Sequence, residues 1–250
     1  THEDLNPNTR FVDNAVIQQI RNTKELENYI NHQKMSLDNY PELIKRLYNE
    51  IIESDVYKKY MENENTSFRK DKDIIINIFK NHIGNCELLF QNLEEQSIYW
   101  NDDIDFAISM AIKTLKQCKK NNHNSIPLLP LYKDADDKEF VKTLFRKTVL
   151  NFKETKELIR SHTKNWDFER IAFMDIIIMQ TAVNEILAFE TIPIKASLNE
   201  YIEIAKYYST KQSSTFINGI LDRLIHSLVT EDKIVKTGRG LVGEHRLTEK

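Results

Sequence analysis

Residues that interrupt helices are scarce in this chain. Its 250 residues include only five glycines and five prolines, whereas proteins on average contain about 7% glycine and 5% proline. Apolar residues recur at the spacing of one helix face, as at Phe216, Ile217, Ile220 and Leu221. Long helices and few tight turns are what such a composition can build. The sequence therefore predicts an all-α protein.

The expected helices fall into two groups. An N-terminal helical region spans residues 1–118 and a second helical domain spans 137–230, with a proline-containing linker at 119–136. The last stretch, 231–250, carries glycines and charges and is expected to be a flexible tail. Periodicity predicts helices at about 16–33, 41–62, 71–96, 102–120, 137–151, 153–164, 167–189, 197–208 and 213–229.

Start signals accompany the last two expected helices. The stretch SLNE at 197–200 has the form of a capping box, in which Ser197 and Glu200 bond to each other's backbone amides. The hydroxyl-rich stretch 209–215 offers several side chains that could cap the next helix. Inside that helix, Gly219 predicts a close crossing by another helix, with Asn218 bonding across the crossing. Both residues are thus expected to be structural.

Two segments of the chain look alike. Residues 71–100 align with 137–166 without a gap, pairing Phe79 with Phe145 and Trp100 with Trp166. One interpretation is a duplicated helical unit, with a partial repeat at 71–120. The other is chance similarity between two amphipathic helices, since two copies are fewer than a solenoid needs.

Several kinds of chemistry are not indicated. Cys86 and Cys118 are far apart, and the seven histidines are scattered without metal-ligand spacing. The stretch GRGLVG at 238–243 matches a dinucleotide-binding pattern, but the strand and the distal acidic residue that such a site requires do not accompany it. We therefore expect no enzyme activity, metal, cofactor or small-molecule substrate.

Charge and hydropathy limit the kinds of partner and the cellular location that we expect for this protein. A net charge of −3 argues against a basic nucleic-acid coat over the whole surface, although a local patch remains compatible with it. The chain contains no apolar run of 18 residues, which predicts no membrane span. With two isolated cysteines, the expected location is a reducing cytoplasm.

Asp175 is an unusual acid, because it lies within the apolar stretch IAFMDIIIM. A buried carboxylate without a partner is costly. It could form an internal salt bridge, with Arg170 or Arg223 as the candidate cations. Alternatively, it could wait on an apolar rim for a basic protein partner.

Near the last two helices, cations, hydroxyls and an aromatic residue gather in the sequence. Helix N-termini bind phosphates, lysines add positive charge, and an aromatic ring can stack on a base. This combination suggests a small single-stranded RNA site, while a solvated surface and a core phenylalanine are the simpler interpretation. The candidate RNA-binding residues are Lys195, Lys206, Lys211, Gln212, Ser213, Ser214 and Phe216.

Three stretches, read in order, resemble the C-terminal helices of the bacterial NusB family. They are WDFERIAFMDIIIMQTAVNEIL at 166–187, IPIKASLNEYIEIAKYYST at 192–210 and SSTFINGILDRL at 213–224. The resemblance covers about 137–229. It implies a NusB-like helical bundle preceded by an additional helical region, as in an enlarged branch of the family.

The resemblance also implies a function without catalysis. NusB proteins bind the boxA element of nascent RNA together with the ribosomal small-subunit protein NusE, within an antitermination complex on RNA polymerase, typically at ribosomal RNA operons. By this resemblance, Glu169 and Asp175 match the acidic NusE-facing positions. Gln212, Ser213 and Phe216 match positions at the RNA-facing start of the last helix. The implied location is the bacterial cytoplasm.

The chain departs from the family pattern in three ways. The family's arginine-rich first helix has no counterpart, since TRFVDNAVIQQIRN stands there; it was cut away, or RNA binding is reduced. An isoleucine, Ile194, replaces the aromatic residue of a Pro-aromatic-Lys loop, and Lys211-Gln212 replace an often acidic position. One alternative function is therefore a helical protein–protein adaptor that has lost RNA binding. Another is an appendage of an RNA cytosine methyltransferase, although these residues show no methyl-donor domain.

Overall fold

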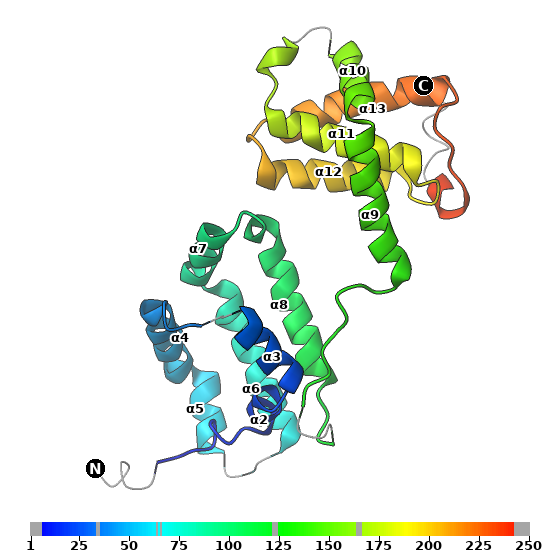
Figure 1. Cartoon of the computed structure of the whole chain (residues 1–250). Coiled ribbons are helices and arrows are strands. Elements are labelled where there is room, and N and C mark those ends of the chain that lie inside the picture. The colour runs from blue at the N-terminus through cyan, green and yellow to red at the C-terminus, as the bar shows by residue number, and fades with distance from the viewer. Residues whose placement is uncertain are drawn as a thin grey trace. The chain divides into compact units, whose positions relative to one another are not determined.

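The chain consists of helices throughout the part that the structure describes. The computed structural model describes residues 7–33, 36–63, 65, 67–121, 125–163 and 167–242. Within these ranges every regular element is helical, which confirms the all-α prediction (Figure 1). Two compact units, Thr1–Pro130 and Leu131–Lys250, divide the chain. Their boundary falls inside the stretch predicted as a linker.

Unit 1 contains shorter helices than the periodicity predicts, because local caps interrupt them. Ser54 ends one helix and accepts a hydrogen bond from the Tyr57 amide to start the next, at 3.3 Å. Asn22 and Thr23 likewise separate the first two helices of the described part. The helices are α2 Ala15–Arg21, α3 Lys24–Gln33, α4 Pro41–Glu53, α5 Asp55–Glu62, α6 Phe68–Asn81, η1 Ile83–Asn85, α7 Glu87–Gln96 and α8 Trp100–Gln117.

A buried polar cluster joins three helices of unit 1. The Asn14 side chain accepts from the Val16 amide at 2.9 Å, which caps α2, and donates to the Tyr60 hydroxyl at 3.1 Å. Tyr60 in turn donates to Asp71 at 2.8 Å. Burial, followed by this bond to Asp71, raises the pKa of Tyr60. The cluster is therefore a set of satisfied contacts between α2, α5 and α6.

The first part of the predicted linker is attached to α2 and its end. Gln19 donates to the Lys119 carbonyl at 3.0 Å, and the Ile126 amide donates to the Thr23 hydroxyl at 2.9 Å. These bonds hold the described residues that follow α8 against the start of unit 1.

Unit 2 is built around one central helix, α11, which packs against four others (Figure 1). Most of α11 is buried, including Met179, Ala182, Val183 and Ile186. A helix that is apolar on nearly all sides belongs in the middle of a bundle. The elements are α9 Ala135–Leu150, α10 Phe152–His162, η2 Phe168–Arg170, α11 Phe173–Ala188, α12 Ile194–Tyr208, α13 Ser213–Thr230 and η3 Gly238–Leu241.

The capping box predicted at 197–200 is wrong. Helix α12 already begins at Ile194, after Pro193, so Ser197 lies inside the helix. Its hydroxyl donates instead to the Glu185 carboxylate at 2.6 Å, and Tyr201 donates to the other oxygen of Glu185 at 2.7 Å. All three residues are buried. Ser197, which the sequence pattern predicts as a helix cap, thus joins α12 to α11.

The segment after α13 makes specific contacts up to residue 242, unlike the flexible tail predicted for it. The Lys236 ammonium donates to the carbonyls of Ile186 and Phe189, both at 2.9 Å. Gly240 lies so close to the segment after α11 that a Cβ there would be 1.9 Å from the Glu190 carbonyl oxygen. Close approach thus explains this glycine of the GRGLVG stretch. Residues 243–250 lie outside the described part.

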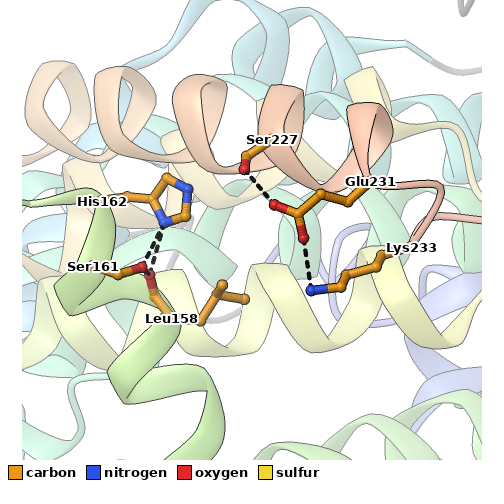
Figure 2. A network of polar contacts seen from close by, with 6 residues as sticks. All are labelled: Leu158, Ser161, His162, Ser227, Glu231 and Lys233. Carbon is orange, nitrogen blue, oxygen red and sulfur yellow. Dashed lines mark hydrogen bonds and ion pairs between the residues drawn. The ribbon is translucent and has the colours of Figure 1, made fainter.

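A polar group surrounds the end of α13 (Figure 2). Glu231 accepts from Ser227 at 2.9 Å and pairs with Lys233 at 2.7 Å. These contacts, Lys233 first, lower the pKa of the exposed Glu231 carboxyl. Across from it, His162 Nδ1 lies 2.9 Å from the Leu158 carbonyl oxygen at the end of α10. The group marks where the chain turns back toward α11.

The two similar segments pack differently. Phe79 packs against the core of unit 1, whereas its counterpart Phe145 on α9 is 72% exposed. Trp166, the second aromatic of the alignment, lies outside the described residues.

We expect Tyr201→Phe to lower the free energy of unfolding by about 1–3 kcal/mol, because Glu185 loses a buried donor. Burial, and then the bond to Glu185, raise the pKa of Tyr201. A raised native pKa gives stability below the unfolded value of about 10, and this stability is lost as pH rises above it. Between about pH 9 and 11, wild type should therefore lose more stability than Tyr201→Phe in chemical denaturation. Tyr132→Phe is the control; equal pH slopes for wild type and Tyr201→Phe would contradict the assignment.

Candidate nucleic-acid interface

A chain of hydroxyl groups connects the start of α11 with the start of α13. Ser209 donates to the Asp175 carboxylate at 2.5 Å, and Ser213 donates to Ser209 at 3.1 Å. Thr210 completes the group, with its amide 3.2 Å and its hydroxyl 2.8 Å from the Ser213 oxygen. Together these bonds set the position of the α12–α13 loop over the end of α11.

Asp175 belongs to this network rather than to an internal salt bridge. Its side chain is 5% exposed, and within the described residues it forms no ion pair. Arg223, one of the candidate cations, directs its Nε to the Gly219 carbonyl at 3.1 Å. The predicted pairing with Arg170 or Arg223 is therefore wrong, and a hydroxyl satisfies one carboxylate oxygen instead.

Helix α13 begins at Ser213 without a side-chain cap. The residue before it, Gln212, makes no side-chain bond to the first-turn amides. Ser213 as a whole is 2% exposed, and its hydroxyl is already bonded within the network. A phosphate-binding role for the Ser213 hydroxyl is therefore wrong. The hydroxyl instead bonds to Ser209 and Thr210 and so holds the α12–α13 loop in place. Ser214, half-buried, is next to it on the helix.

Two hollows open at this end of the unit. The first, which we call the inner hollow, has a volume of about 480 Å³. It brings the acid Asp175 together with the cation Arg170 and the aromatic Phe216. Its walls are Asp167, Arg170, Ile171, Ala172, Asp175, Thr210, Gln212, Ser213 and Phe216.

The second, the outer hollow, also has a volume of about 480 Å³ and follows α13 away from its start. It shares Gln212 and Phe216 with the inner hollow, so the two adjoin at these side chains. Two basic residues, Lys211 and Arg223, line this hollow. The complete lining is Lys211, Gln212, Thr215, Phe216, Gly219, Ile220 and Arg223.

The three predicted lysines are not all together. Lys211 lines the outer hollow. Lys206, in the last turn of α12, forms an ion pair with Glu203 at 2.5 Å, which offsets its charge. Lys195 is exposed in the first turn of α12, about 16 Å along the helix from Lys206. Glu169, the second predicted partner contact, is exposed in the turn η2, beside Arg170.

The structural roles predicted for Asn218 and Gly219 are wrong. Both are exposed, and no atom of the described residues lies within 4 Å of a Cβ built on Gly219. No side-chain hydrogen bond of Asn218 occurs in the described part. A glycine inside a helix costs about 1 kcal/mol relative to alanine. At Gly219 no close packing within unit 2 accounts for that cost.

Sequence reasoning missed Arg170 and Arg223 as walls of these hollows. Arg170 and Arg223 were considered only as partners for Asp175. The available signal for Arg223 was its spacing from Phe216 and Gly219, since positions four and seven residues apart share a helix face. That spacing does not tell which face is covered by other helices.

Within the described residues, no helix is both long and apolar enough to cross a membrane. Across the same residues, no group of His, Cys, Asp and Glu side chains is arranged to hold a metal ion.

We expect Ser213→Ala to lower the free energy of unfolding by about 1–2 kcal/mol, because it removes the center of the hydroxyl network. The neighboring Ser214→Ala should change it by less than about 0.5 kcal/mol. Chemical denaturation of both variants measures the difference. Equal stabilities would show that the network does not hold the loop.

Comparison with known proteins gives a consistent family. The NusB family model matches residues 106–226, beginning within α8 and so reaching further toward the N-terminus than the resemblance predicts. The transcription antitermination protein NusB of Salinibacter ruber is 36% identical over 155 residues, covering 62% of this chain and 90% of that protein.

Two further comparisons match smaller parts of the chain. The NusB of Chloroherpeton thalassium is 38% identical over 109 residues, 44% of this chain and 52% of that protein. A solved structure of T. maritima NusB is 27% identical and matches 54% of this chain and 83% of that one, with a TM-score of 0.35. Because the chain matches nine-tenths of the S. ruber protein at more than one-third identity, it belongs to the NusB family.

Proposed function

We propose that this protein acts in transcription antitermination, binding boxA-type single-stranded RNA together with the ribosomal protein NusE on transcribing RNA polymerase. The observation that carries the proposal is the inner hollow, where Asp175, Arg170 and Phe216 share one concave surface. Family membership supports it, since curated relatives are named transcription antitermination proteins.

The RNA side of the proposal rests on the start of α13. The first-turn amides have no side-chain cap, and a helix N-terminus attracts phosphate through such amides and its dipole. Lys211 adds a positive charge beside them. Phe216 stands in the walls of both hollows, where a base could stack on its ring. Gln212 and Ser214 flank this surface.

The protein side rests on the start of α11. Phe173 is 68% exposed and Met174 is also exposed, immediately before the acid Asp175. Tyr207, exposed near the end of α12, lies at the same end of the bundle because Ser209 bonds to Asp175. Exposed apolar groups beside an acidic side chain suit a partner that is apolar and basic.

The alternative is an adaptor that binds the protein partner but not RNA. The net charge of −3 and the exposed apolar side chains near Asp175 favor it. Fluorescence anisotropy of a labeled boxA-type RNA, with and without NusE, separates the two functions. Partner-strengthened binding that weakens with salt supports the proposal. Absence of any partner-dependent gain would exclude it.

We expect Phe216→Ala to weaken RNA binding about 5- to 150-fold, because stacking on one aromatic contributes about 1–3 kcal/mol per base. Phe145→Ala is the matched control, since Phe145 is exposed on α9 and lines neither hollow. Anisotropy titrations measure both, and circular dichroism checks the fold, because Phe216 also packs against the core. Equal RNA affinities in both variants would contradict the stacking role.

We expect Asp175→Asn to weaken NusE binding about tenfold while leaving RNA affinity within about twofold, since one desolvated charge contact is worth about 1–3 kcal/mol. Asparagine retains the shape and the acceptor for Ser209. Glu169→Gln removes an exposed charge nearby and tests the other predicted partner contact. Calorimetric titration with NusE provides the affinities. A wild-type value for Asp175→Asn would remove Asp175 from the partner surface.

A further inference from the structure

Gly219 has no packing reason within unit 2 to be a glycine. It is exposed on α13 and nothing in the described part approaches the place of a Cβ. The residue nevertheless lines the outer hollow, one turn beyond Phe216. Absence of a side chain there keeps this part of the hollow open down to the helix backbone, where a ligand can approach closely.

Arg223 stands at the far end of the same hollow. Its Nε donates to the Gly219 carbonyl at 3.1 Å, which holds the guanidinium over the glycine. Within the described residues it forms no ion pair. A guanidinium held through Nε still presents its two terminal nitrogens, the pair that binds a phosphate in a fork.

Lys211 at the near end adds a second cation to the wall. The outer hollow thus runs from Lys211, past the ring of Phe216 and the helix backbone at Gly219, to Arg223. Positive charges along a groove beside an aromatic ring are the features by which proteins hold single-stranded nucleic acid. An acidic peptide would meet the cations as well, but it would make no use of the ring shared with the inner hollow.

We propose that the outer hollow is a second RNA subsite, which takes the sugar–phosphate backbone next to the base at Phe216. Gly219 leaves room for the backbone against α13, and Arg223 binds a phosphate. This inference rests on the proposed RNA-binding function and extends it along α13. The contact is to the backbone, so it is independent of base sequence.

The sharpest test is at Gly219. Gly219→Ala should raise the melting temperature by about 2–4 °C, because alanine favors the helix, yet weaken RNA binding about threefold. Gly219→Gln should weaken RNA binding further, as a longer side chain fills the hollow. Asn218→Ala is the matched control, since this exposed neighbor lines neither hollow. It should keep wild-type RNA affinity.

Arg223→Gln tests the phosphate contact. It should weaken binding of a boxA-type RNA about tenfold and reduce the slope of log affinity against log salt by about 0.7, the amount expected for one phosphate contact on a single strand. Lys153→Gln removes the same charge from α10, outside both hollows, and should change the slope little. An RNA shortened at one end should no longer distinguish Arg223→Gln from wild type.

The outcomes separate the two proposals. If wild type binds no RNA with or without NusE, the proposed function fails. If wild type binds RNA and Phe216→Ala weakens it, but Gly219→Gln and Arg223→Gln do not, the second subsite is overturned. If these variants bind NusE more weakly than wild type in the absence of RNA, the second subsite is also overturned, because the outer hollow would then be a protein contact.

Discussion

The burial of α11 is the constraint on which unit 2 depends. A helix enclosed on most sides must find a partner for each polar side chain that it carries into the core. Gln180 donates to the Phe152 carbonyl at 2.6 Å, and Asn184 accepts from Asn151 at 2.8 Å, which places the α9–α10 junction. Glu185 accepts hydrogen bonds from Ser197 and Tyr201 and thereby joins α12 to α11. Asp175 accepts a hydrogen bond from Ser209 and thereby holds the α12–α13 loop. The polar residues of one helix thus determine where its neighbors lie.

The candidate interface follows from the last of these contacts. Because Ser213 is engaged by Ser209 and Thr210, the start of α13 is held beside the start of α11. Phe216, Asp175 and Arg170 consequently line one concave surface, the inner hollow. The network also removes Ser213 from the surface, so the groups left for a ligand are backbone amides, Lys211 and the aromatic ring. Through its bond to Ser209, the buried Asp175 thus also positions the helix that carries Phe216.

The segment after α13 shows how a backbone contact can hold a charged tail. The Lys236 ammonium is buried but satisfied by two carbonyls at the end of α11. Helix C-termini leave carbonyls without partners and carry a partial negative charge, so a cation there is favored. Gly240 allows the chain to lie against the Glu190 carbonyl. The two contacts attach the end of unit 2 to its central helix, away from the start of α11.

The sequence alone determined the helical class and the approximate positions of the last three helices, because apolar spacing and the shortage of glycine and proline are local properties. Two of the predicted starts differ from the structure, since α11 begins at Phe173 rather than at residue 167 and α12 at Ile194 rather than at residue 197. It also determined the family, through motifs around Asp175 and Phe216. Tertiary structure decided the roles of individual residues. Ser197 resembles a cap but bonds to Glu185, and Asp175 lacks the salt bridge that its neighbors suggested. Gly219 suggested a buried crossing but lies open on the surface. Periodicity states which residues share a helix face, whereas only the packing of other helices decides which face is covered and which polar groups meet.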